Sequence, residues 1–256
     1  MKIGISFSGG GARAAAHVGV IKALRQNGIV ANYVSGTSGG AIVGALYSAN
    51  FSIEQMLMFA SEGKLLRIYT PGIPLQGLTS LDYLKKVLRK HKVPKSFGDL
   101  EIPFYVAATN LSTGLTETLN AGNLYEAILA SCSIPLLFKP VTINGNLYVD
   151  GGLTNNLPSE VLTPLCDIVI GVNVMPNVSL PNSELKSIYG IGLRAFNIAA
   201  SNNSYIDYQN LNIIIEPPKL SNYNVFNFGS YLDMYEIGYE QTMEQMDSIK
   251  AICGLI

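Results

Sequence analysis

Charged residues are scarce in this chain of 256 residues: Asp, Glu, Lys and Arg make up 14%, whereas apolar residues make up 48%. A typical soluble domain carries roughly 25% charged residues. The formal net charge is −1, so the composition offers no basic surface of the kind that binds nucleic acid. The shortage of charge and the mean hydropathy of +0.27 predict deeply buried strands, an apolar pocket, or both.

Long apolar runs and paired cysteines are also missing. No run approaches the roughly 20 residues needed to cross a bilayer, and the N-terminus is a short apolar run before glycines, unlike a secretory leader. Cys132, Cys166 and Cys253 are widely spaced and form no C-x-x-C motif. These features predict reduced thiols in a cytoplasmic protein, for which transient peripheral contact with a membrane surface is a further expectation. The oligomeric state is left open.

Histidine is limited to His17 and His91. No group of His, Cys, Asp or Glu has the spacing of a metal site, so we expect a metal-independent protein without a cofactor. His17 falls on a predicted helix, where a packed, hydrogen-bonded role is expected. His91 lies in the basic stretch RKHK, where we expect it to be solvated.

Strand-like and helix-like stretches alternate along the chain, which predicts an α/β fold: a mainly parallel sheet with helices on both faces. No linker, repeat or low-complexity tract interrupts residues 1–256, so a single domain is expected. Residues 138–143 and 147–150 flank Asn144-Gly145 as a hairpin with a type I′ turn. Strands are predicted at 2–8, 31–35, 103–110, 167–174 and 211–217, and helices at about 12–26, 41–50, 52–61, 81–90 and 123–132 and over the last 25 residues.

The stretch SFSGGGARAAAHVG (6–19) places three glycines between a strand and a helix. Such a loop can turn main-chain N–H groups toward an anionic guest, either a phosphate or a transient oxyanion. The loose dinucleotide fingerprint is present, but no acidic residue precedes Glu54 to hold a ribose, and no G-K-[ST] follows. We therefore do not expect a nucleotide, although a tight turn without any ligand would also explain this loop taken alone.

Ser38 lies in a second glycine-rich junction, Gly36-Thr37-Ser38-Gly39-Gly40, which has the G-x-S-x-G form of a nucleophile elbow. Gly and Ser are common, so the pattern alone is weak. A predicted strand precedes it and a predicted helix follows, as an elbow requires. In a parallel sheet both glycine junctions lie at the carboxyl ends of their strands, where such sheets place their sites.

A nucleophilic Ser38 needs a base, and neither histidine lies at the position along the chain that the triad of α/β-hydrolases requires. The triad of α/β-hydrolases ends with a histidine, but none follows residue 91. A carboxylate is the alternative. Asp150 ends a predicted strand directly before Gly151-Gly152, whereas capping or solvation explains Asp82 and Asp99, and Asp167 opens a strand at the wrong end.

Three motifs in this order, GGGAR (9–13), GTSGG (36–40) and DGG (150–152), resemble those of the patatin-like phospholipases. The resemblance covers about residues 2–175 and includes HVGVIKAL (17–24), FGDLEIPFYVAATNLSTG (97–114), ASCSIP (130–135) and NNLP (155–158). The family often has Gly where Ala14 stands, a mild change on a helix. The resemblance implies a three-layer α/β fold and a serine acyl hydrolase acting on lipid esters, either phospholipid or lysophospholipid, through a Ser–Asp dyad.

The resemblance also implies roles for individual residues. Ser38 would be the nucleophile and Asp150 its base. The amides of Gly10 and Gly11, in a loop shaped by Gly9, would form the oxyanion hole, and Arg13 would brace that loop. A catalytically idle lipid- or partner-binding protein on the same fold is the alternative, although it would not need all of these residues.

Two apolar segments and one basic segment bear on the substrate. Residues 63–79, with Leu65, Leu66, Ile68 and Tyr69, and the aromatic stretch 221–231 could cover an acyl pocket or touch a bilayer, although both are equally compatible with ordinary packed loops. A basic run could attract anionic lipid, but a solvated helix face explains it better. That run consists of Lys85, Lys86, Arg89, Lys90, Lys92 and Lys95.

Overall fold

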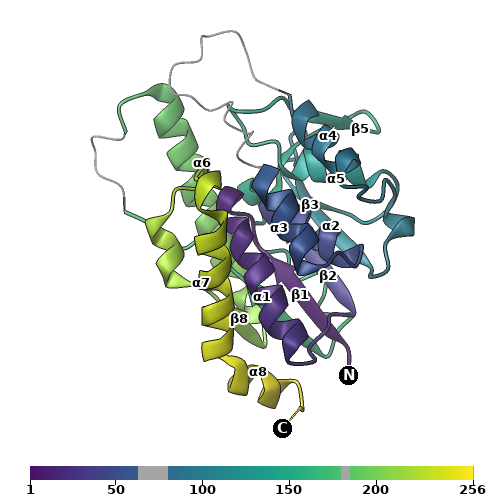
Figure 1. Cartoon of the computed structure of the whole chain (residues 1–256). Coiled ribbons are helices and arrows are strands. Elements are labelled where there is room, and N and C mark those ends of the chain that lie inside the picture. Colours follow the sequence, from purple (N-terminus) through teal and green to yellow (C-terminus); the bar gives the residue numbers. More distant parts are fainter. Residues whose placement is uncertain (63–79, 180–184, 256) are drawn as a thin grey trace.

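The computed structural model describes residues 1–62, 80–179 and 185–255 (Figure 1). In these residues one mixed sheet runs in the order β5-β6-β3-β2-β1-β7-β8, and β4 pairs with β3 off this path. The strands β1, β2, β3, β7 and β8 are parallel, whereas β4, β5 and β6 add antiparallel pairings. The strands are β1 Ile3–Phe7, β2 Tyr33–Thr37, β3 Phe104–Asn110, β4 Thr116–Leu119, β5 Val141–Ile143, β6 Asn146–Asp150, β7 Ile168–Val172 and β8 Ile213–Ile215.

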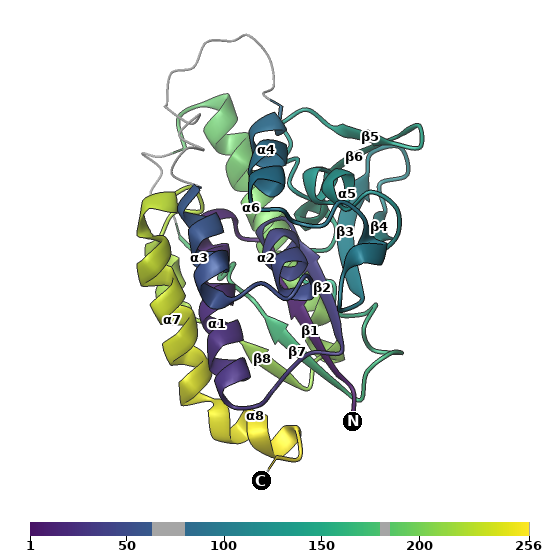
Figure 2. The ribbon, with the colours of Figure 1, turned by 45° about the vertical axis from the view of Figure 1, so that its right-hand side comes forward.

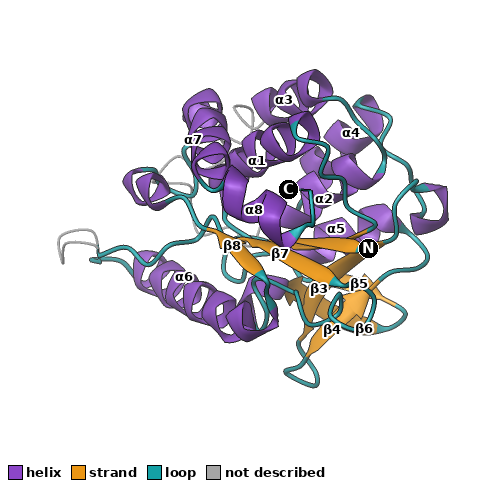
Figure 3. Cartoon of the chain, turned by 90° about the horizontal axis from the view of Figure 1, so that it is seen from below, coloured by secondary structure: helices purple, strands orange, loops and turns teal. Residues whose placement is uncertain are grey.

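Helices cover both faces of this sheet unequally. Viewed from below, α6 lies on one face, and the other labelled helices lie on the opposite face (Figure 3). The predicted α/β fold with a mainly parallel sheet and helices on both faces is therefore confirmed. The helices are α1 Ala15–Gln26, α2 Gly39–Ser48, α3 Ile53–Ser61, α4 Asp82–Lys90, α5 Leu124–Ser131, α6 Ile188–Ile206, α7 Tyr231–Glu244 and α8 Met246–Ile252.

The parallel strands form the centre of the core. Ile5, Phe7, Val34, Val106 and Ile170 are all fully buried. Strands covered on both faces need apolar side chains in both directions, which explains the near-continuous apolar runs and the low charge of the sequence.

Most of the predicted elements are present, with three differences. The sequence reading did not identify β4 or α6, and the predicted C-terminal helix is two helices, α7 and α8, separated at Gln245. The hairpin over β5 and β6 is present, and both turn residues, Asn144 and Gly145, have positive φ (49° and 84°), as a type I′ turn requires.

Helix α7 packs along α1, and both views of the ribbon show the two side by side (Figures 1 and 2). Glycines permit this close approach: a β-carbon at Gly238 would collide with the carbonyl oxygen of Ala16, and one at Gly19 with that of Tyr235. The C-terminal part of the chain is thus fixed against the helix that follows the glycine loop.

Candidate active site

Ser38 occupies the sharp turn between β2 and α2. It is the N-cap of α2 and has φ 52° and ψ −119°, a backbone conformation that L-residues rarely adopt. The turn packs so closely on β1 that a β-carbon at Gly40 would collide with the carbonyl oxygen of Phe7. The flanking glycines of the motif are therefore steric requirements of a strained elbow, which leaves Ser38 buried with 7% of its surface exposed.

A neighbouring serine holds this strained residue in place. The Ser38 N–H donates to Ser131 Oγ at 2.8 Å, and the Ser131 hydroxyl donates in turn to the carbonyl oxygen of Ala107 at 2.6 Å. Ser131 is the last residue of α5, and Ala107 lies in β3. The elbow is thus hydrogen-bonded through Ser131 to helix α5 and to the adjacent strand β3.

Asp150 reaches the elbow because of the register of β6, which is antiparallel to β3. Ala107 pairs with Thr37 on one side of β3, and Ala108 pairs with Asp150 on the other. The strand β6 therefore starts beyond the carboxyl end of β2 and runs back to it. The N–H of Asp150 donates to the carbonyl oxygen of Ser133 at 3.0 Å, which fixes this end of the strand.

The Asp150 carboxyl group is almost completely buried, with 1% of the residue exposed. Its Oδ1 accepts a hydrogen bond from Gly152 N–H at 2.8 Å, whereas Oδ2 is buried without a well-formed hydrogen bond among the described residues. Burial raises the Asp150 pKa from 3.8 to about 7, and the nearby Ser38 side chain and the Gly152 N–H lower it in part. The group can therefore be protonated or ionised near neutral pH.

The glycine loop lies directly beside these two residues. The Gly9 N–H donates to the carbonyl oxygen of Asn156 at 3.0 Å, and the Ala12 N–H donates to that of Val225 at 2.7 Å. Among the described residues, the N–H groups of Gly10 and Gly11 have no such partner. Gly11 has φ +57°, and a β-carbon there would collide with the Val225 carbonyl. Glycine is therefore needed at position 11 for both conformation and space.

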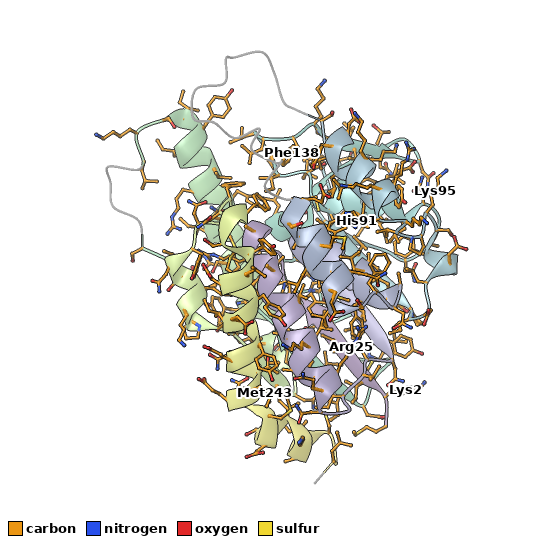
Figure 4. The ribbon with its side chains drawn as sticks, in the orientation of Figure 1. Lys2, Arg25, His91, Lys95, Phe138 and Met243 are labelled. Carbon is orange, nitrogen blue, oxygen red and sulfur yellow. The ribbon has the colours of Figure 1, made fainter. Side chains whose placement is uncertain are left out.

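Two apolar cavities of about 90 and 100 Å³ adjoin this centre. They share wall residues that include Ile42, Leu84 and Phe228. The second also contains Ser38 and Phe138, and Phe138 lies at the end of the molecule opposite Lys2 and Met243 (Figure 4). An apolar space therefore begins at the nucleophile position and continues between α2, α3 and α4.

A third, smaller cavity of about 20 Å³ also contains Ser38. Its lining includes Asp150, Asn156, Asn197 and Phe226 together with the glycine loop. Ser38 thus borders both the apolar space and a small cavity that polar side chains help to line.

Comparison with protein families agrees with this geometry. The family model described as patatin-like phospholipase matches residues 5–163, which include the glycine loop, the elbow and Asp150. The chain belongs to the patatin-like phospholipase family. The family resemblance of the sequence motifs is therefore confirmed.

Curated relatives of this patatin-like chain include lysophospholipases. "Lysophospholipase NTE1" from Kluyveromyces lactis is 26% identical over 292 residues, an alignment that covers 98% of this chain and 20% of the yeast protein. An uncharacterized NTE family protein from Mycobacterium bovis is 30% identical over 177 residues, covering 68% of this chain and 49% of that protein. The chain thus spans about 20% to 49% of the length of these relatives.

Solved structures show the same fold. VipD from Legionella pneumophila superposes with a TM-score of 0.55 at 16% identity, covering 96% of this chain and 67% of that one. Human GIVD cytosolic phospholipase A2 gives a TM-score of 0.50 at 13% identity, covering 98% of this chain and 58% of that one. At these identities the likeness supports the patatin-like fold and no finer property.

Arg13 ties the glycine loop of the patatin-like domain to the C-terminal part of the chain. Its Nε donates to the carbonyl oxygen of Tyr223 at 2.8 Å. Burial lowers the Arg13 pKa to about 10, so the guanidinium stays charged at neutral pH. This contact is compatible with the bracing role expected for Arg13.

Several residues of the site were not identified from the sequence. Ser131 and Cys132 lie in the ASCSIP motif, which was noted only as a family stretch. Burial raises the Cys132 pKa well above its usual range, the Asp150 charge adds to this, and hydrogen bonding with Ser38 opposes it, so its thiol lies beside both residues. Asn156 lies in the NNLP stretch that also carries the family resemblance, and its side chain lies beside Gly9 and donates to Ser204 Oγ at 2.9 Å. Val225 acts through its carbonyl oxygen, which any residue type supplies, so only a structure could find it.

Within the described residues, each histidine contacts groups other than Ser38. His17 is fully buried, its Nε2 bonds to the carbonyl oxygen of Ser8 at 2.9 Å, and burial lowers its pKa to about 4. The expectation that His91 is solvated was wrong: its side chain is 9% exposed and lies 3.5 Å from Glu62 and against the Phe59 ring. The apolar side of α4 draws the end of that helix onto α3.

Residues 63–79, with Leu65, Leu66, Ile68 and Tyr69, lie outside the described residues. Across the described ranges, no group of three or more His, Cys, Asp or Glu side chains could hold a metal ion, and the absence of a cofactor stays a prediction. No helix within those ranges is long and apolar enough to cross a bilayer. The three cysteines are free thiols.

Proposed function

We propose that this patatin-like chain is a serine hydrolase that cleaves carboxylic esters of lipids, phospholipid or lysophospholipid, with Ser38 as nucleophile and Asp150 as base. The observation that carries the proposal is the position of Ser38 on a strained elbow beside a buried carboxylate, whose Oδ2 has no other well-formed hydrogen bond in the part of the chain that the structure describes. The family and the lysophospholipase relatives support the reaction class.

In the first step the Ser38 hydroxyl attacks the ester carbonyl carbon while Asp150 accepts its proton. A free carboxylate with a pKa near 4 is a weak base, and a pKa of about 7 makes Asp150 a better one. The carbonyl oxygen becomes an oxyanion, to which the N–H groups of Gly10 and Gly11 donate. Each such donor is worth about 3–4 kcal/mol in the transition state elsewhere.

In the second step the tetrahedral intermediate collapses and the bond from the carbonyl carbon to the alcohol oxygen breaks. The alcohol leaves with the proton held by Asp150, and the acyl group remains on Ser38. Water then attacks the acyl-enzyme and Asp150 takes its proton. The bond from the acyl carbon to Ser38 Oγ breaks, Ser38 recovers the proton from Asp150, and the fatty acid leaves. One carboxylate thus serves as base and acid in alternation, without a histidine.

The apolar cavities are the proposed acyl site. The second of them contains Ser38, and both are lined by aliphatic and aromatic side chains such as Ile42 and Phe228, whereas the smaller cavity with Asn156 and Asn197 would hold the alcohol side. Burying a methylene group contributes about 0.8 kcal/mol, so a longer acyl chain should bind more tightly until the cavities are filled.

A fluorophosphonate probe tests the proposal directly. We expect it to label Ser38 covalently in the native protein and not in Ser38→Ala, with identification of the labelled peptide by mass spectrometry. A panel of acyl esters then measures turnover. Labelling of another residue, or no turnover of any ester by a folded protein, would contradict the proposal and favour the idle binding protein.

A further inference from the structure

The first turns of α6 expose large apolar side chains. Ile188, Tyr189 and Ile191 are 86%, 55% and 54% exposed. Because consecutive helical residues are rotated by about 100°, these three side chains lie within one half of the helix surface. Leu136, 44% exposed, lies against Gly192 of the same helix. We call Leu136, Ile188, Tyr189 and Ile191 the apolar tip.

The apolar tip lies at the end of the molecule that carries the candidate active site. Helix α6 begins at the end toward which the parallel strands run (Figures 1 and 2). Further along the same helix, Phe196 and Asn197 line the small cavity that contains Ser38 and Asp150. One helix therefore joins the exposed apolar surface to the site.

Basic residues flank the tip in the sequence. Lys139 follows Leu136 by three residues, and Lys186 and Arg194 lie next to and within α6. Lys139 and Lys186 are exposed, whereas Arg194 donates to the carbonyl oxygen of Val178 at 2.6 Å. An apolar surface that lies beside exposed basic residues is suited to a membrane whose surface carries phosphate groups.

We propose that the apolar tip inserts into a phospholipid bilayer and docks the active site onto it. The inference rests on the proposed lipid-ester hydrolysis. From Ile188 to Phe196 the helix rises about 12 Å, and interfacial apolar groups insert about 5–10 Å into a bilayer. Insertion of the first turn thus places the Ser38 cavity near the depth of the glycerol esters, so that a substrate reaches the site without entering water.

A second copy of the chain or another helix would be a different kind of partner. A second copy docking through the same surface would bring the exposed Lys139 and Lys186 near those of its partner, and like charges repel. A bilayer that contains anionic lipid offers the opposite charge and buries the apolar side chains at the same time. The bilayer is therefore the occupant that the charge favours.

Vesicle binding of the full chain tests the proposal. The test variant combines Ile188→Glu with Ile191→Glu. A matched control places the same two charges at the opposite end of the molecule, Val30→Glu with Leu255→Glu, since both of these residues are 53% exposed. All variants carry Ser38→Ala in the binding assay, so that turnover does not consume the vesicles, which are phosphatidylcholine with or without phosphatidylglycerol.

We expect the tip variant to bind vesicles on the order of ten-fold or more weakly than the parent, because two isoleucine side chains no longer enter the bilayer. The matched control should bind like the parent, and phosphatidylglycerol should strengthen binding of the parent. Equal binding by both double variants would overturn the proposal. The proposal would also be overturned if the parent did not bind vesicles and sedimented as a dimer, whereas the tip variant sedimented as a monomer.

A soluble ester separates this inference from the proposed function. With Ser38 intact, the tip variant should hydrolyse p-nitrophenyl butyrate like the native protein but lose activity toward lipid in vesicles. This also shows that it is folded, and thermal unfolding gives a second check. If the native protein hydrolyses no ester but binds vesicles through the tip, the proposed function fails and the docking surface stands.

Discussion

Residues 5–163 and the part of the chain that follows them contribute to the same site in different ways. The first region carries the recognisable motifs, with the elbow, the glycine loop and Asp150, and matches the family model. The second carries no motif, yet the Val225 and Tyr223 carbonyls hold the glycine loop and Phe226 and Phe228 line the cavities. The first region carries the proposed catalytic residues and most of the cavity walls, and the second supports the glycine loop and completes those walls.

This difference follows from what each region supplies. A nucleophile, a base and an oxyanion hole need particular residue types in particular conformations, so they leave a sequence pattern. A carbonyl oxygen or an apolar wall can come from many sequences, provided that the fold places it correctly. Substitutions in the two regions should therefore affect different kinetic properties.

The largest effect is expected for the two proposed catalytic residues. Ser38→Ala and Asp150→Asn should each reduce kcat/KM on every ester by about 10³–10⁶-fold. Because the two groups act as one unit, the double variant should be little worse than either single one. Asp99→Asn, an exposed carboxyl away from the site, is the control. Appreciable turnover by Asp150→Asn would exclude Asp150 as the base.

Asp150→Asn should also make the protein more stable at neutral and higher pH. The unfolded chain releases the Asp150 proton near its ordinary pKa, whereas the folded chain keeps it up to about pH 7. Between these values the folded state binds more protons, so the free energy of unfolding falls as the pH rises, and levels off above pH 7. Asp150→Asn removes this decrease in the free energy of unfolding, which amounts to up to about 4 kcal/mol.

Denaturant unfolding at several pH values measures this effect. The difference between Asp150→Asn and the native protein should be small near pH 4 and largest above pH 7. A difference that does not depend on pH would mean that Asp150 does not carry a raised pKa in the folded chain.

A smaller and more selective effect is expected in the second region. Phe228 lines both apolar cavities, so Phe228→Ala should lower kcat/KM for long-chain esters by on the order of ten-fold, with little effect on short ones. Asn227→Ala, at the exposed neighbouring position, should leave both unchanged. Equal losses for all chain lengths would remove the distinction between the two regions.

The smallest effect on catalysis is expected for His91, which lies in the first region but contacts groups other than Ser38. His91→Gln should keep turnover within about three-fold, because the proposed dyad needs no histidine. It should lower stability by about 1 kcal/mol, since the buried ring packs on Phe59. An inactive but folded His91→Gln protein would restore a histidine mechanism.

The sequence was sufficient for the fold class and for the elements with strong patterns. The parallel strands are apolar throughout, and the glycines around Ser38 are required by backbone contacts that leave no space for a side chain. Helix α6 was not predicted because Gly190, Gly192 and several Asn residues weaken its helical signal and part of its apolar surface faces outward. The burial of His91 depends on how α3 meets α4, which the local sequence RKHK does not encode.

The backward course of β6 has a consequence for biosynthesis. The elbow at Ser38 leaves the ribosome long before Asp150, and the Val225 carbonyl that holds the glycine loop follows later still. If Ser38 and Asp150 act as proposed, a partly synthesised chain has a nucleophile without its base, and a loop without its support. The proposed hydrolysis therefore requires β6 paired with β3 and α7 packed on α1, which only the finished chain provides.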